Sequence, residues 1–197
     1  MKLKEMKVKV FSLIEEYYPT ETTLAEDEDV KNKINGVINQ IQMDLMPLRK
    51  IEASQDIEVG TNDDKKIDLK DRLNNLYQIS AIYFENETEY EMLNSTTILL
   101  PNNYEGTFTV YYYKYPELAK LIFESEEESA AYDSKYTFEL DNDLLEVMPY
   151  GVAADLLKMD MISNYGQYFY NRYLEMKQRI DSRRTSGSIR ITNGVDI

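Results

Sequence analysis

The stretch that decides the fold is residues 140–160, which read LDNDLLEVMPYGVAADLLKMD. Apolar side chains recur there at helical spacing and cover most of the circumference, which is typical of a helix buried among its neighbours. The spacing predicts a helix over residues 142–162. Pro149 lies inside the pattern, so it either kinks this helix or is the true first-turn residue.

Three further helices are predicted by amphipathic patterns. Apolar residues spaced by three and four positions mark residues 2–18, 30–48 and 166–184. Pro19 ends the first of them and Pro47 the second, because proline removes a backbone donor and clashes with the preceding turn. With the buried helix, the sequence predicts a bundle of four main helices.

The period changes between the second and third helices. Short alternating segments separated by turn signals run through residues 51–116, and they close with YYYKYP at residues 111–116. Several short strands at this spacing indicate a small antiparallel sandwich or barrel. The expected fold class is therefore α+β, a helical bundle with an inserted antiparallel β domain and an extended, strand-like C-terminal arm.

The expected organisation of the chain has four parts. They are a helical hairpin at 1–50, the β module at 51–116, an acidic spacer with the C-terminal helices at 117–184, and the arm at 185–197. Inside the arm, apolar and polar residues alternate, which suits a strand that adds to a sheet of another chain. Two alternatives are a frayed terminus and a strand that joins the protein's own sheet. The strand-like residues are Ser188, Ile189, Arg190, Ile191 and Thr192.

The amino-acid composition limits the kinds of catalytic, metal-binding and DNA-binding sites that the chain can form. The chain carries 36 acidic and 22 basic residues, a net charge of −14, which disfavours tight electrostatic DNA binding. It has no histidine and no cysteine, which excludes Ser-His and Cys-His nucleophiles and thiolate metal sites. The acid-rich residues 124–143 lack the calcium-binding EF-hand pattern. We therefore expect that the chain is not an enzyme and that it has no catalytic site, metal site, cofactor or membrane span.

Tyrosine is over-used, at seventeen residues without any tryptophan. Tyrosine is enriched at interfaces, and it is also a common residue of sheets and cores. The candidates for a subunit interface or for the core are Tyr111, Tyr113, Tyr168, Tyr173 and Leu156. A second hypothesis is that aromatic rings of the β module stack on sugar rings of a carbohydrate or receptor; these rings are Tyr104, Phe108, Tyr111, Tyr112 and Tyr113.

The order of these elements resembles the head–tail connector proteins of tailed bacteriophages, also called adaptor or head-completion proteins. The resemblance rests on Tyr-Tyr-x-Tyr-Pro at 112–116, Leu-Asp-x-Asp at 140–143, and Pro-Tyr-Gly-Val-Ala-Ala-Asp-Leu-Leu-Lys-x-Asp at 149–160. It follows the order of nearly the whole chain and is strongest over residues 107–182. No single motif in it is specific.

The resemblance implies a structural virion protein that is made in the host bacterial cytoplasm. Such proteins form a ring, commonly of twelve copies, beneath the portal protein of the filled capsid. The ring extends the DNA channel, lets DNA pass without sequence-specific binding, and offers a platform to a stopper or tail protein. Residues 185–197 would then form the portal-contacting arm, and the two C-terminal helices the structural core of the ring. The β module is the part in which family members differ most.

Overall fold

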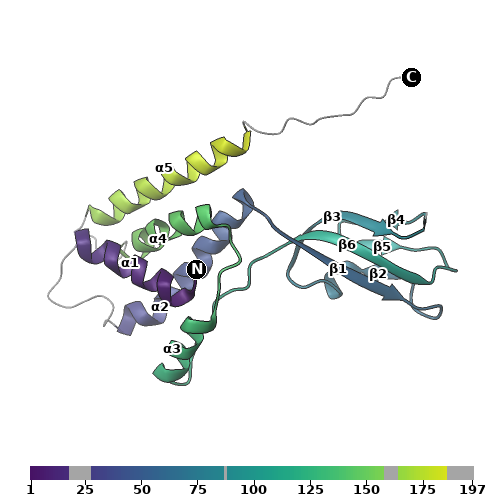
Figure 1. Cartoon of the computed structure of the whole chain (residues 1–197), viewed down its shortest axis with the longest axis horizontal. Coiled ribbons are helices and arrows are strands. Elements are labelled where there is room, and N and C mark those ends of the chain that lie inside the picture. The colour runs from purple at the N-terminus through teal and green to yellow at the C-terminus, as the bar shows by residue number, and fades with distance from the viewer. Residues whose placement is uncertain (18–27, 87, 158–163, 186–197) are drawn as a thin grey trace. The chain divides into compact units, whose positions relative to one another are not determined.

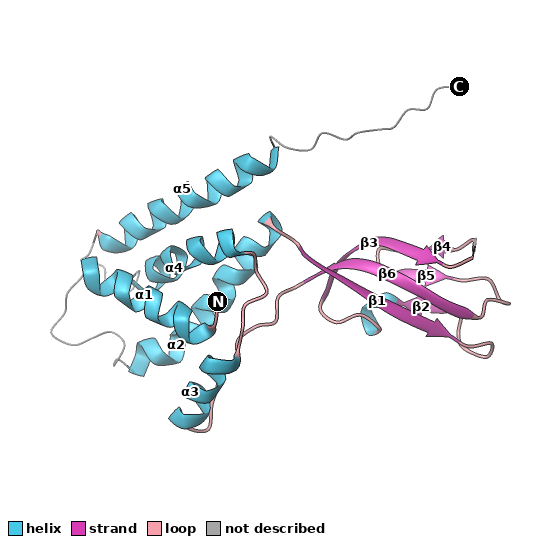
Figure 2. Ribbon diagram, viewed as in Figure 1, coloured by secondary structure: helices cyan, strands magenta, loops and turns pink. Residues whose placement is uncertain are grey.

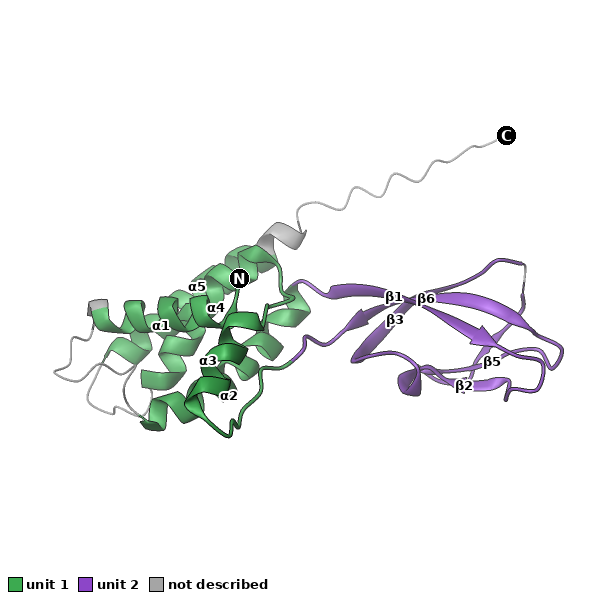
Figure 3. Cartoon of the chain, turned by 60° about the horizontal axis from the view of Figure 1, so that its bottom comes forward, with its two compact units in different colours: residues 1–48, 118–197 green, residues 49–117 purple. Residues whose placement is uncertain are grey.

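The protein combines helices with antiparallel sheets, so it is α+β as the sequence predicts (Figures 1 and 2). The computed structural model describes residues 1–17, 28–86, 88–157 and 164–185. The chain divides into two compact units, a helical unit of residues 1–48 and 118–197 and a β unit of residues 49–117 (Figure 3).

The helical unit is organised around its most apolar helix. The α-helices are α1 (Leu3–Tyr17), α2 (Glu28–Leu45), α3 (Glu126–Lys135), α4 (Asn142–Leu157) and α5 (Tyr165–Thr185), and a short 3-10 helix, η1 (Met46–Leu48), follows α2. α4 packs against α1, α2 and α5, which explains why apolar side chains are needed around most of its circumference. Pro149 lies inside α4 and is buried, so it is not the first-turn residue.

The structure contains a fifth α-helix, α3, which the sequence pattern does not reveal. None of its side chains is buried, so it has no apolar periodicity. Interactions at its N-terminus stabilise α3 instead. The side chain of Ser125 accepts a hydrogen bond from the backbone N–H of Glu128 at 3.1 Å, and three glutamates in the first turn interact favourably with the helix dipole. The helix predicted over residues 142–162 corresponds to α4, which ends at Leu157; residues 158–162 lie outside the described residues.

The β unit consists of two three-stranded antiparallel sheets, with strand orders β1-β6-β3 and β2-β5-β4. β1 pairs with β6 without a break, from Ile51 opposite Lys114 to Val59 opposite Gly106. The strands are β1 (Ile51–Val59), β2 (Lys66–Asp68), β3 (Leu76–Phe84), β4 (Glu91–Met92), β5 (Thr97–Leu99) and β6 (Gly106–Lys114), and a 3-10 turn, η2 (Leu69–Asp71), follows β2.

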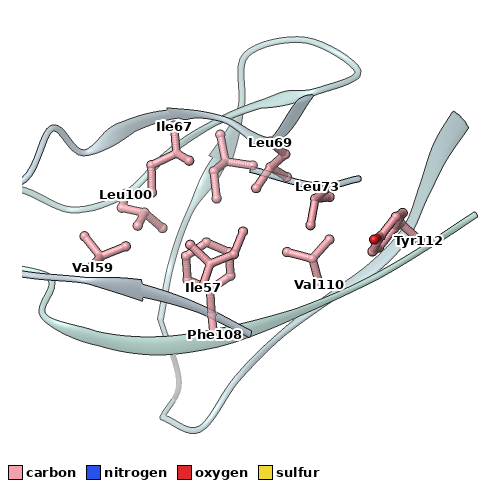
Figure 4. Close-up of a cluster of buried hydrophobic side chains, with 10 residues drawn as sticks. Ile57, Val59, Ile67, Leu69, Leu73, Leu100, Phe108, Val110 and Tyr112 are labelled. Carbon is pink, nitrogen blue, oxygen red and sulfur yellow. The ribbon is translucent and has the colours of Figure 1, made fainter. Parts of the chain in front are cut away.

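The core of the β unit lies between the two sheets. Alternate residues of β1 and β6 point inward, among them Ile57, Phe108 and Val110, and they meet Ile67 and Leu100 from the other side (Figure 4). Phe108 is almost completely buried. Because side chains alternate across a strand, the residues between these core positions are turned to the opposite face of the β1-β6-β3 sheet.

Candidate functional site

Large aromatic and apolar side chains gather on the surface of both units, and these surfaces are the candidate sites. Among the described residues, no three or more acidic side chains are grouped so that they could hold a metal ion. No described helix is long and apolar enough to cross a membrane. Each candidate surface is built up below from its residues.

The outer face of the β1-β6-β3 sheet carries four tyrosines, and we call it the tyrosine face. Tyr77, Tyr83 and Tyr111 are exposed, and Tyr113 is half-buried. In β6, Tyr112 is 5% exposed and turned to the core, whereas its neighbour Tyr111 is 48% exposed. The residues paired with Tyr111 are Ser54 of β1 and Ala81 of β3, and these small side chains leave the ring uncovered.

One end of the tyrosine face is fixed by a lysine. The Lys50 Nζ lies 4.7 Å from the centroid of the Tyr113 ring and donates a hydrogen bond to the Gln78 side-chain oxygen at 2.7 Å. The Tyr77 and Tyr115 rings pack edge to face, with centroids 5.1 Å apart. These contacts hold some of the rings in place before any partner arrives.

The outward side of α5 is a second candidate surface. Phe169, Tyr173 and Ile180 turn inward and are buried, which leaves the opposite side of the helix exposed. The large exposed side chains of α5 are Tyr165, Tyr168, Tyr170 and Leu174. Arg172 and Arg179 lie beside them, and both are paired with Glu175.

A groove of about 750 Å³ lies between α1, α2, α3 and the segment that leads into α3. Its apolar lining includes Phe11 of α1, Ile34 of α2, and Leu121 and Ile122 of that segment. Ile122 is 81% exposed, although it is a large aliphatic residue. Such exposure is typical of a surface that another chain covers.

Two asparagines of α2 hold the segment that carries Leu121 and Ile122. Asn39 donates to the Ala119 carbonyl at 2.8 Å and accepts from the Ala119 N–H at 2.7 Å, so both backbone groups of this buried residue are satisfied. Asn35 donates to the Lys120 carbonyl at 2.8 Å. These bonds fix the backbone while the apolar side chains of the segment stay in solvent.

A polar cluster ties α2 to α5. The Asp44 carboxylate accepts hydrogen bonds from the Tyr173 hydroxyl and from the Lys177 Nζ, the latter at 2.7 Å. Burial raises the pKa of Asp44, but the hydrogen bonds from Lys177 and Tyr173 outweigh burial, and its pKa lies below the ordinary value. Burial and the hydrogen bond to Asp44 raise the pKa of Tyr173. The cluster borders a small pocket of about 210 Å³ and positions two helices.

The residues singled out from the sequence are spread over both units. Tyr111 and Tyr113 belong to the tyrosine face and Tyr168 to the exposed side of α5, while Tyr173 is buried in the polar cluster. Leu156 is partly buried on α4. The arm candidates Ser188, Ile189, Arg190, Ile191 and Thr192 lie outside the described residues.

The sequence prediction missed the groove. Leu118, Leu121 and Ile122 lie in a stretch that was expected only to be an acidic spacer, and no periodicity marks them. The available signal is their position, since three large aliphatic residues within five positions precede a run of glutamates and follow no amphipathic pattern. Asn35 and Asn39 interrupt the α2 pattern as polar positions, and nothing local shows that they are buried.

Comparison with models of known protein families finds no match, and comparison with curated proteins finds none either.

Proposed function

We propose that this chain is a head–tail connector protein of a tailed bacteriophage, with a structural and not a catalytic role. In this proposal the copies form a ring beneath the portal protein, DNA passes through the ring, and a stopper or tail protein docks on the other side. The protein would be located in the virion, in the connector region. The order of elements and the residues at 112–116, 140–143 and 149–160 support it through the resemblance described above.

The observation that carries the proposal is the exposure of large apolar and aromatic side chains on both units. Ile122, Tyr83 and Tyr111 are 81%, 61% and 48% exposed. Interfaces are enriched in tyrosine, and an exposed aliphatic patch with a polar rim marks a contact site. A connector subunit needs several such surfaces, because it contacts two neighbouring copies, the portal and a tail-side protein.

The finer architecture belongs to the same proposal. α1, α2, α4 and α5 would form the helical bundle of the ring subunit, and residues 185–197 would extend from it as the portal-contacting arm. The acidic composition fits a DNA channel, because strong attraction to phosphates would slow the passage of DNA.

The experiment is co-purification with the portal protein encoded in the same viral genome. We expect the full chain to form a ring on the portal that is visible by negative-stain electron microscopy, and we expect deletion of residues 185–197 to abolish attachment without altering the fold. A matched pair separates a specific strand from a general effect of the tail: Ile189→Asp with Ile191→Asp should abolish attachment, whereas Val195→Asp with Ile197→Asp should not. If the truncated chain still attaches to the portal, the arm assignment is wrong.

A second candidate function is carbohydrate binding through the tyrosine face. The specific observation is that exposed rings share this face with carboxylates of β1, since Glu52 is paired with Tyr113 and Asp56 accepts a hydrogen bond from Thr109 at 2.7 Å. Aromatic faces stack on sugar rings, and carboxylates accept hydrogen bonds from sugar hydroxyls. Glycan-array binding by the full chain that is lost in Tyr111→Ala would favour this function over the connector.

A further inference from the structure

The β unit has four strands at the edges of its two sheets, and three of them are protected against pairing with another chain. An edge strand presents backbone N–H and C=O groups that a further strand can bond, and natural proteins protect such edges by short length or by charge. β2 and β4 have only three and two residues. β1 has nine residues but carries three carboxylates, on Glu52, Asp56 and Glu58.

The fourth edge strand, β3, has neither kind of protection. It has nine residues, and its sequence, LYQISAIYF, contains no charged residue and no proline. It lies at one edge of the β1-β6-β3 sheet (Figure 2). In the part of the chain that the structure describes, the backbone of β3 is bonded to β6 and to no other element. β3 therefore offers a free and uncharged edge to a further strand.

The second half of β3 has the regular geometry that an added strand needs. The register shifts of β3 against β6 lie before Ala81, and the residues from Ala81 to Phe84 pair with Tyr111 to Phe108 without interruption. Bulges bend and twist a strand, so the first half of β3 is less suited to pairing. An added strand should therefore pair with residues 81–84.

The side chains of this half are incompletely covered. Tyr83 is 61% exposed, and among the described residues its ring packs on no other ring and its hydroxyl has no hydrogen-bond partner. Tyr77 in the first half, by contrast, packs edge to face on Tyr115. On the core side, Ile82 and Phe84 pack against the buried cluster but are only half-buried. A strand added at this edge would cover all three side chains.

We propose that the second half of β3 pairs in antiparallel orientation with the same segment of a second copy, with Tyr83 at the two-fold axis. In this register Tyr83 lies opposite Tyr83 of the second copy, and Ile82 lies opposite Phe84, so outward residues meet outward ones and core-side residues meet core-side ones. Because β3 has no charge, it meets itself without repulsion, whereas self-pairing of β1 would bring carboxylates together. The same edge offers no ion pair to a charged strand of a different protein, so we assign it to a second copy.

The contact joins the β1-β6-β3 sheets of two copies into one continuous sheet, and their tyrosine faces become one surface. Because both copies use the same segment, the contact is symmetric and stops at two copies. The inference does not rest on the proposed connector function, since a symmetric contact cannot by itself build a ring of more than two copies.

The first test is sedimentation velocity of the full chain over a range of concentrations. The paired segment is short, so we expect a weak dimer whose fraction rises with concentration. Ala81→Glu should weaken the dimer about tenfold, because residue 81 lies opposite Glu85 of the second copy and symmetry places two such like-charge pairs in each dimer. Ser54→Glu is the matched control and should leave the dimer unchanged. Ser54 and Ala81 are both exposed and flank Tyr111 from β1 and from β3.

Cross-linking distinguishes edge pairing from stacking of the two tyrosine faces. The chain has no cysteine, so a single introduced thiol reports one position. Under mild oxidation, Tyr83→Cys should give several-fold more disulfide-linked dimer than Tyr111→Cys. Both tyrosines are exposed on the same face, but in the paired sheet the two copies of residue 111 lie three strand spacings apart, about 14 Å, which is too far for a disulfide.

Three results overturn the inference. They are a full chain that stays monomeric at every concentration, a dimer that Ala81→Glu and Ser54→Glu weaken equally, and equal cross-linking yields for Tyr83→Cys and Tyr111→Cys. If Ala81→Glu fails to fold, hydrogen exchange of the unsubstituted chain replaces it. Exchange of the β3 amides should slow as concentration rises while exchange of the β1 amides does not, and β3 exchange that is independent of concentration also overturns the inference.

Discussion

Replacing Gly151 of α4 with alanine should destabilise the helical unit, although alanine is the better helix former. A Cβ at this position would lie 2.9 Å and 3.0 Å from two ring carbons of Tyr173 and 3.1 Å from the Ile41 Cγ2. Carbon atoms in contact prefer separations of about 3.5–4.0 Å. The glycine is therefore needed for the close approach of α4 to α2 and α5.

The magnitude follows from three terms. Overpacking a core by a methyl group costs about 1–3 kcal/mol. The Tyr173 ring is buried and its hydroxyl is bonded to Asp44, so a shift of the ring also weakens a hydrogen bond worth about 1 kcal/mol. Alanine in place of glycine in a helix interior contributes about 1 kcal/mol in the opposite direction. We expect Gly151→Ala to lower the unfolding free energy by about 2 kcal/mol.

The assay is urea unfolding followed by the helical circular dichroism signal, with Gly36→Ala as the matched control. Nothing lies within 4 Å of a Cβ built on Gly36 of α2, so the same substitution there should stabilise the protein by about 0.4–1 kcal/mol. The two variants should thus change stability in opposite directions. In a Tyr173→Leu background, Gly151→Ala should cost less, because the ring it strikes is gone. The reasoning is refuted if Gly151→Ala matches or exceeds the wild type in stability.

Three further predictions concern other contacts. Asn39→Ala should lower the unfolding free energy by about 2–4 kcal/mol, because the N–H and C=O of Ala119 both lose their partner in a buried site; a loss within 0.5 kcal/mol in urea titrations would contradict this. Asp44→Asn should destabilise the protein at neutral pH. The pKa of Asp44 is depressed by folding, so its contribution is present above the ordinary value of 3.8 and is lost as pH falls through the folded pKa; thermal melts of the variant and the wild type should therefore converge in acid, and a constant difference would exclude this role. In β6, Tyr112→Ala should cost about 3–5 kcal/mol and Tyr111→Ala about 0.5 kcal/mol or less, as measured by thermal unfolding, and equal losses would show that the two faces are misassigned.

Much of the helical unit could be predicted from the sequence because its helices bury one side. Leu3, Met6 and Val10 recur at helical spacing and are all fully buried, and Ile34 and Ile38 do the same in α2. α3 could not be predicted in this way, because a capping serine and first-turn glutamates favour it while none of its residues is fully buried.

The ends of the strands are harder to predict from the sequence than the helices. β6 alternates β-branched and aromatic residues over most of its length, so its strand is evident from the sequence. β1 begins at Ile51, although its alternating pattern is clear only from Gln55. The first residues of β1 are strand because they pair with the end of β6, where Tyr113 and Lys114 lie. The partner of a strand is a long-range property that no local pattern contains.

Of the candidate surfaces, the tyrosine face could be predicted from a local pattern, whereas the groove could not. The outward direction of Tyr111 and Tyr113 in β6 follows from alternation, since Tyr112 must face the core if Phe108 and Val110 do. The groove does not follow from any pattern, because it depends on Asn35 of α2 meeting a backbone carbonyl 85 positions away in the sequence.

The pairing of β1 with β6 has a consequence for the history of the chain. Ile51 and Lys114 are directly opposite each other in an antiparallel ladder, so the chain enters and leaves the β unit at points about 5 Å apart. Because its first and last residues are adjacent, the β unit can be removed and the helical unit rejoined by a short turn. Recombination between genomes can therefore exchange the whole β unit, and with it the tyrosine face, while the helical unit keeps its sequence and its fold.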